Sequence, residues 1–236
     1  MKWSEVFTEQ AALFRAAVDQ ADLGARVPSC PGWTFADLTV HVGRFVHTVA
    51  RYLTTAPVVE VRPLPPTETT DPIGYLDERL ALAADAIAIT PGNRPVWTFS
   101  PAAPDLAWVW QRRAAHELNL RRWDAQAALR TLDTTDPEQA TDAIDELLGT
   151  LLAARLRLDS PPAGTGTAVV AATDTGRSWF VRLTPGEAPE VKSVNGSEQA
   201  DARVANRAEN VLYQLWNRMR LTGDGDERVL RALRMS

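Results

Sequence analysis

Residues 27–43, Val27-Pro-Ser-Cys-Pro-Gly-Trp-Thr-Phe-Ala-Asp-Leu-Thr-Val-His-Val-Gly43, lead from a turn into a helix. Two prolines and a glycine precede Thr34, and Asp37 follows it at the spacing of a capping box. The stretch therefore predicts a helix from Phe35 to about Thr54. Within this helix, His41 shares a helically spaced stripe with apolar residues, namely Leu38, Val42, Phe45 and Val49.

His41 has two interpretations at this point. Its place in an apolar stripe favours a core histidine that is satisfied by one hydrogen bond. The other interpretation is a ligand for a metal ion. His47 lies six residues further along and is expected to point to another side of the helix.

Three further segments have helical spacing of apolar residues, and loops that contain proline or glycine separate them. These segments run from Trp3 to about Ala21, from Ile73 to Ile89, and from Asp105 to about Leu129. Four helices joined by loops predict an antiparallel four-helix bundle.

The pattern changes towards the end of the chain. Asp136-Pro137 predicts a helix start, with the helix running to about Leu158, and a Pro/Gly/Ser-containing break follows from Asp159 to Gly166. Strands are expected at 167–173, 178–184, 190–194 and 200–205, and helices at 208–219 and 226–235. The sequence thus predicts an α+β protein with domains 1–158 and 159–236, although the Pro137 helix could pack on either side of the boundary.

Composition excludes several classes of protein. The chain has 236 residues and a net charge of −5, which argues against a general nucleic-acid partner. Its apolar stretches are too short and too interrupted to predict a membrane span, and its first residues lack the apolar core of a secretory signal. We therefore expect a cytoplasmic protein. Cys30 is the one cysteine, and it is interpreted as a packed loop residue.

The longest predicted helix carries charged residues on one stripe, namely Arg113, Glu117, Arg121 and Asp124. Such a stripe is either a solvated face or a polar cluster inside the bundle. If the cluster lies inside the bundle, His41 and Glu117 on facing helices could be two ligands of a metal ion. Two ligands are too few for catalytic zinc, which normally takes three from the protein. Arginine cannot ligate, and His116 lies about 100° round the helix from Glu117.

Two motifs in this order resemble the signature segments of the mycothiol-dependent maleylpyruvate isomerase family. They are residues 27–43, quoted above, and Arg113-Ala-Ala-His-Glu-Leu-Asn-Leu-Arg-Arg-Trp-Asp-Ala125. The segment 204–230, with Leu215-Trp-Asn-Arg218, is similar to the end of that family's sequences. The resemblance implies a DinB-like bundle domain followed by a small sterol-carrier-like α+β domain.

The resemblance also implies a site. His41 and Glu117 match two ligands of the family's divalent metal, usually zinc, whereas Arg121 takes the place of the third, a histidine. His116 would be a weak substitute ligand. Arg218 matches an arginine that steadies a substrate carboxylate. In the family, the metal activates mycothiol for addition to an electrophilic substrate.

Two functions follow as hypotheses. The first is a thiol-dependent isomerase or S-transferase for a small electrophilic acid, with a pocket between the two domains lined by His41, Glu117, Arg121 and Arg218. Its partners would be a small-molecule substrate and a low-molecular-weight thiol, with no nucleic acid or membrane, and it would be a monomer or a homodimer. The second is a metal-free, inactive relative that binds a small molecule or a partner, in which Arg121 pairs with Glu117.

Overall fold

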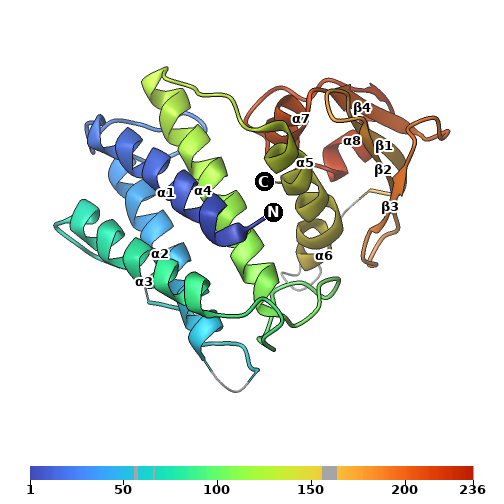
Figure 1. Cartoon of the computed structure of the whole chain (residues 1–236). Coiled ribbons are helices and arrows are strands. Elements are labelled where there is room, and N and C mark those ends of the chain that lie inside the picture. Colours follow the sequence, from blue (N-terminus) through green and yellow to red (C-terminus); the bar gives the residue numbers. More distant parts are fainter. Residues whose placement is uncertain (56–57, 66, 156–163, 236) are drawn as a thin grey trace. The chain divides into compact units, whose positions relative to one another are not determined.

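The computed structural model describes residues 1–55, 58–65, 67–155 and 164–235. The chain forms two compact units (Figure 1). The bundle unit comprises Met1–Thr98 and Pro104–Asp133, and the sheet unit comprises Phe99–Ala103 and Thr134–Ser236. The two units are described separately below.

Among the described residues of the bundle unit there are four helices, as the sequence predicted: α1 (Trp3–Asp19), α2 (Phe35–Thr54), α3 (Pro72–Ile89) and α4 (Ala107–Leu129). Helix α1 packs against α3 and α4, and α2 also packs against α3 and α4. Apolar side chains from all four helices close the core, including Phe14, Leu38, Leu76 and Leu118, which are each fully buried. None of the described helices is long and apolar enough to cross a membrane.

The predicted capping box is present at the start of α2. The Asp37 backbone N–H donates to Thr34 Oγ1 at 3.2 Å, and the Thr34 backbone N–H donates to Asp37 Oδ2 at 2.8 Å. Gly32 has a φ of +88°, a conformation that side chains rarely adopt, and its carbonyl accepts a hydrogen bond from Arg26. These contacts fix where α2 begins and therefore where His41 lies.

Helix α4 is buried around most of its circumference. Its polar residues are buried together with its apolar ones: Gln111, Arg112, Arg113, His116, Glu117, Asn119, Arg122, Asp124 and Gln126. The charged stripe predicted from the sequence is therefore a buried polar cluster rather than a solvated face. Buried charges are tolerated where they pair with one another.

The sheet unit begins with the helix that Asp136-Pro137 predicted. Asp136 caps α5 (Pro137–Glu146) by accepting from the Gln139 N–H, and the helix continues as a π-helical turn, η1 (Leu147–Leu151), and a short α6 (Leu152–Ala154). The predicted end of this helix, with residues 156–158, and residues 159–163 of the predicted break lie outside the described residues.

Helix α5 packs on a helix of the sheet unit, α7 (Ala208–Leu215), so the two units divide after Asp133. This division differs from the predicted boundary at 158/159. Ile144 is fully buried, and the Trp179 ring N–H donates to Asp145 at 3.0 Å. The buried face of the helix, which the sequence could not assign to either side, thus lies in the sheet unit.

A five-stranded sheet has the order β3-β2-β1-β4-β5. The strands are β1 (Gly166–Ala172), β2 (Arg177–Leu183), β3 (Glu190–Val194), β4 (Ala202–Asn206) and β5 (Asp224–Gly225). The predicted hairpin joins β1 to β2, whereas β1 pairs with β4 in parallel. Helices α7 and α8 (Glu227–Ala232) both pack on β1 and β4. The four predicted strands and both helices are present, and β5 is an addition, so the α+β prediction is confirmed.

Candidate functional site

A buried cluster of charges on α4, here called the charge cluster, comprises Arg113, Glu117, Arg121 and Asp124. Arg121 Nε donates to Glu117 Oε1 at 2.7 Å, and Arg113 Nη2 donates to Glu117 Oε2 at 2.8 Å. Arg121 Nη1 donates to Asp124 Oδ2 at 3.0 Å. Both carboxylate oxygens of Glu117 therefore already accept a hydrogen bond from an arginine.

The ionisation of Glu117 follows from these contacts. Burial alone would raise the pKa of this carboxyl, but the positive charge of Arg121, a hydrogen bond from His41 and the charge of Arg113 outweigh burial and hold the pKa well below its ordinary range. Burial acts to lower the pKa of Arg121, while Glu117 and Asp124 raise it above its ordinary value. Glu117 is thus a carboxylate and Arg121 a guanidinium at neutral pH.

His41 on α2 faces this cluster from the neighbouring helix. Its Nε2 lies 3.4 Å from Glu117 Oε1, and its ring lies 4.7 Å from the ring of Trp33. The side chain is 36% exposed, so His41 is not the enclosed core histidine that its apolar stripe favoured. The structure brings together the two residues that the sequence had paired as ligands.

Cys30 lies against the other end of the charge cluster. The thiol is buried, its sulfur lies 3.4 Å from Asp124 Oδ2, and Arg121 Nη1 lies 3.7 Å from the sulfur. The guanidinium of Arg121 also lies over the ring of Trp33 at 5.7 Å. The turn before α2 and the charge cluster on α4 are therefore one packed assembly.

The remaining predicted metal ligand, His116, points elsewhere. Its ring packs edge-on against the ring of Trp3 on α1, with 5.3 Å between centroids. Among the described residues, no group of three or more His, Cys, Asp or Glu side chains could hold a metal ion. Of the predicted ligands, His41 and Glu117 thus lie together, and Arg121, one turn after Glu117, carries a permanently charged guanidinium that cannot ligate a metal.

Arg218 lies in the sheet unit, three residues after the last residue of α7. Its side chain is half-buried, and its Nη1 donates to the carbonyl of Trp216 at 3.0 Å. Its role towards a substrate, and the pocket predicted between the two domains, stay predictions.

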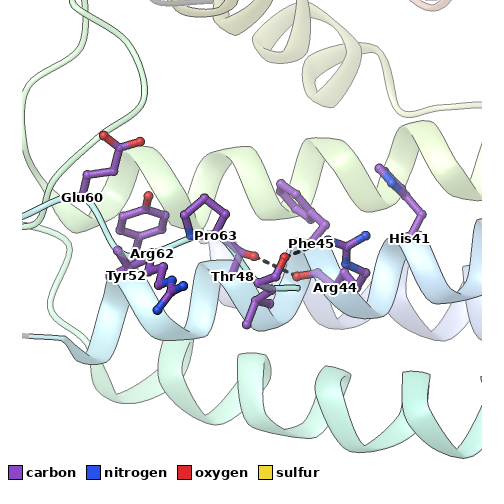
Figure 2. Close-up of a pocket in the computed structure, with 10 residues that line it drawn as sticks. His41, Arg44, Phe45, Thr48, Tyr52, Glu60, Arg62 and Pro63 are labelled. Atoms are coloured by element: carbon purple, nitrogen blue, oxygen red, sulfur yellow. Dashed lines mark hydrogen bonds between the residues drawn. The ribbon is translucent and has the colours of Figure 1, made fainter. Parts of the chain in front are cut away.

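A groove of about 390 Å³ starts at His41 and follows α2 (Figure 2). One wall is the face of α2 that carries Arg44, Phe45, Thr48 and Tyr52, and the other is an extended segment, residues 60–64, here called the strap. Two α2 arginines hold the strap by its backbone. Arg44 Nη2 donates to the Leu64 carbonyl at 3.0 Å, and Arg51 Nη1 donates to the Arg62 carbonyl at 2.7 Å.

The groove was missed by the sequence analysis. Arg44, Thr48 and Tyr52 recur at intervals of four residues, so they share one face of α2 next to the stripe of His41. This polar face of α2, followed in the sequence by a proline-rich segment, was the signal that could have indicated the groove. The partner of that face could not be read from the sequence, because the path of the strap is set by arginine contacts to its backbone.

Comparisons with known proteins point to one family. The family model described as "Mycothiol maleylpyruvate isomerase N-terminal domain" matches residues 5–126. Two solved structures are similar over 95% of this chain and 92% of theirs, each at 13% identity: a mycothiol-dependent maleylpyruvate isomerase with a TM-score of 0.56, and a histidine-to-alanine mutant of such an isomerase with a TM-score of 0.57. No curated protein matches the chain.

Proposed function

The chain belongs to the mycothiol maleylpyruvate isomerase N-terminal domain family, and from this premise we propose that it is a metal-free member that binds a small molecule. In this proposal the family's metal-dependent chemistry has been lost, and the bundle unit has kept the family's scaffold. The proposal corresponds to the second hypothesis drawn from the sequence.

One observation carries the proposal, namely the 2.7 Å contact between Arg121 Nε and Glu117 Oε1. A zinc ion with catalytic function normally needs three protein ligands, and a guanidinium supplies none. A metal ion bound at Glu117 would lie beside the positive charge of Arg121, and displacing Arg121 would break a buried ion pair, which typically costs about 3–5 kcal/mol. The residues present therefore do not fit the family's zinc site.

A buried arginine in this place has a physical role of its own. The carboxylate of Glu117 is only 9% exposed and requires a positive charge nearby. Arg121 and Arg113 supply that charge, and Arg121 also pairs with Asp124, so two guanidinium groups face two carboxylates. The charge cluster is thus internally compensated, and it holds the turn around Cys30 and Trp33 against α4.

A second function is supported by the exposure of His41. A partly exposed imidazole 3.4 Å from a carboxylate, at the mouth of a groove, is an arrangement that enzymes use. Together with family membership, it keeps a thiol-dependent isomerase or transferase for a small electrophilic acid as the competing proposal. In that case mycothiol would be the cosubstrate, and Arg218 would bind the substrate carboxylate.

An activity assay separates the two proposals. The full chain is incubated with mycothiol and maleylpyruvate, with and without added zinc, and isomerisation is followed by absorbance. The metal-free proposal predicts no turnover above the rate without protein, whether or not zinc is present. Zinc-stimulated, thiol-dependent turnover would contradict it and would favour the competing proposal.

A further inference from the structure

The groove between α2 and the strap contains charged side chains that the protein leaves without a charged partner. Within the described part of the chain, none of Arg44, Glu60 and Arg62 forms an ion pair, although all three line the groove. Arg44 uses Nη2 for the Leu64 carbonyl, and its buried Nε–H has no acceptor among the described residues. A guanidinium with spare donors beside a cavity is suited to binding an oxyanion.

The two charges lie towards opposite ends of the groove. Figure 2 shows His41 and Arg44 towards one end, and Tyr52 and Glu60 at the other. Burial raises the pKa of Tyr52, and the negative charge of Glu60, which lies at the same end of the groove, raises it further. Arg44 and Tyr52 are separated by about 12 Å along α2 at a rise of about 1.5 Å per residue.

The part of the groove between the charged ends is lined by apolar side chains together with Thr48 and, nearer Tyr52, Arg62. Its lining includes Phe45 from α2 and, from the strap, Val61, Pro63 and Leu64. The Tyr52 ring stacks on Trp110 at 4.5 Å and on Trp97 at 5.2 Å, which gives the far end a rigid aromatic floor. Rigid apolar walls with a few polar groups are typical of small-molecule sites.

We propose that this groove binds a linear aminocarboxylate, with its carboxylate at Arg44, its ammonium group at Glu60 and an apolar body between them. A zwitterion of this kind gives Arg44 and Glu60 each a partner of opposite charge, whereas a simple carboxylate would leave Glu60 unpaired. The inference rests on the proposed function as a small-molecule-binding protein, and it assigns a place and a ligand class to that binding.

The probe is 8-aminooctanoate, whose charged groups are about 10 Å apart when the chain is extended. Octanoate, which lacks the amine, serves as the matched ligand. Binding of each to the full chain is measured by isothermal titration calorimetry in the presence of EDTA. We expect 8-aminooctanoate to bind about two- to fivefold more tightly than octanoate, the effect of one ion pair with the exposed Glu60.

Two charge-removing variants test the assigned orientation. Arg44→Gln should weaken both ligands about tenfold, whereas Glu60→Gln should weaken 8-aminooctanoate about two- to fivefold and leave octanoate unchanged. Arg177→Gln removes an exposed arginine of the sheet unit and should change neither affinity. Because Arg44 also holds the strap, folding of Arg44→Gln is checked by thermal unfolding. If that variant does not fold, Glu60→Gln still tests the proposal, because Glu60 is exposed and its replacement should not disturb folding.

Three results would overturn the inference: no binding of 8-aminooctanoate, equal binding of octanoate, or a larger loss from Arg62→Gln than from Arg44→Gln. Arg62 also lines the groove, but it is exposed whereas Arg44 is half-buried, so solvent should screen the charge of Arg62 more strongly than that of Arg44. A different result, zinc-stimulated turnover with mycothiol, would contradict the proposed function. Absence of both zwitterion binding and turnover would thus reject the ligand class while leaving the metal-free proposal in place.

Discussion

Replacing Arg121 by histidine should create a zinc site. Two atoms that ligate one tetrahedral zinc at about 2.1 Å are about 3.4 Å apart. His41 Nε2 and Glu117 Oε1 are separated by 3.4 Å, so two ligands already have a compatible spacing. The imidazole Nε2 and the arginine Nε are the same number of bonds from the backbone, and Arg121 Nε reaches Glu117 at 2.7 Å. Arg121→His therefore supplies a third donor near the other two.

The size of the effect follows from binding linkage. At a free zinc concentration 100 times the dissociation constant, binding to the folded state adds about 2.7 kcal/mol to the free energy of unfolding. For a chain of this size, that corresponds to a rise in melting temperature of roughly 5–10 °C. Without zinc the variant should be less stable than the natural protein by about 3 kcal/mol, because Glu117 loses one of its two arginines.

The assay is thermal unfolding with zinc or with EDTA, combined with metal analysis after dialysis. Arg121→Gln is the control, because it removes the same charge and adds no imidazole nitrogen that could ligate zinc. We expect zinc to stabilise Arg121→His and to have no effect on Arg121→Gln or on the natural protein. A folded Arg121→His variant that takes up no zinc would refute the argument that His41 and Glu117 have kept the spacing of metal ligands.

Three further predictions concern the scaffold. Hydrogen bonds from Thr34 and the charge of Arg26 lower the pKa of Asp37. The contribution of Asp37 to stability is therefore present above about pH 4 and is lost as the pH falls through its folded-state pKa. In acid titrations monitored by circular dichroism, Asp37→Asn should reduce this loss of stability. Asp145→Ala should lower the free energy of unfolding by about 1–3 kcal/mol in urea titrations, because the buried Trp179 ring N–H loses this acceptor; an unchanged value would contradict the assigned hydrogen bond. Leu118→Ala should cost about 2–5 kcal/mol in the same measurement, since Leu118 is fully buried, and a loss below 1 kcal/mol would contradict its place in the core.

Local sequence signals predicted most of the helices and strands. The capping box at Thr34, the Asp136-Pro137 start and the turn between the first two strands are encoded within a few residues, and each lies where it was expected. The parallel pairing of β1 with β4 joins segments that are distant in the sequence, so no local pattern could specify it. The same reason explains why the side on which α5 packs stayed open.

The charge cluster was predictable in its members but not in its environment. A helix that is buried around most of its circumference has no polar face, so the pattern of α4 could not separate a solvated stripe from a buried one. The departure at Arg121 was visible in the sequence through the resemblance. Its pairing with Glu117 was one of two alternatives, and the structure places the two groups 2.7 Å apart.

The central claim is that the charge of Arg121 has replaced that of a metal ion beside Glu117. The most direct test is elemental analysis of the full chain, purified without an affinity tag and without chelators. The account predicts zinc and other divalent metals far below one equivalent per chain, and no increase after incubation with zinc and dialysis. Close to one equivalent of tightly held zinc would contradict it.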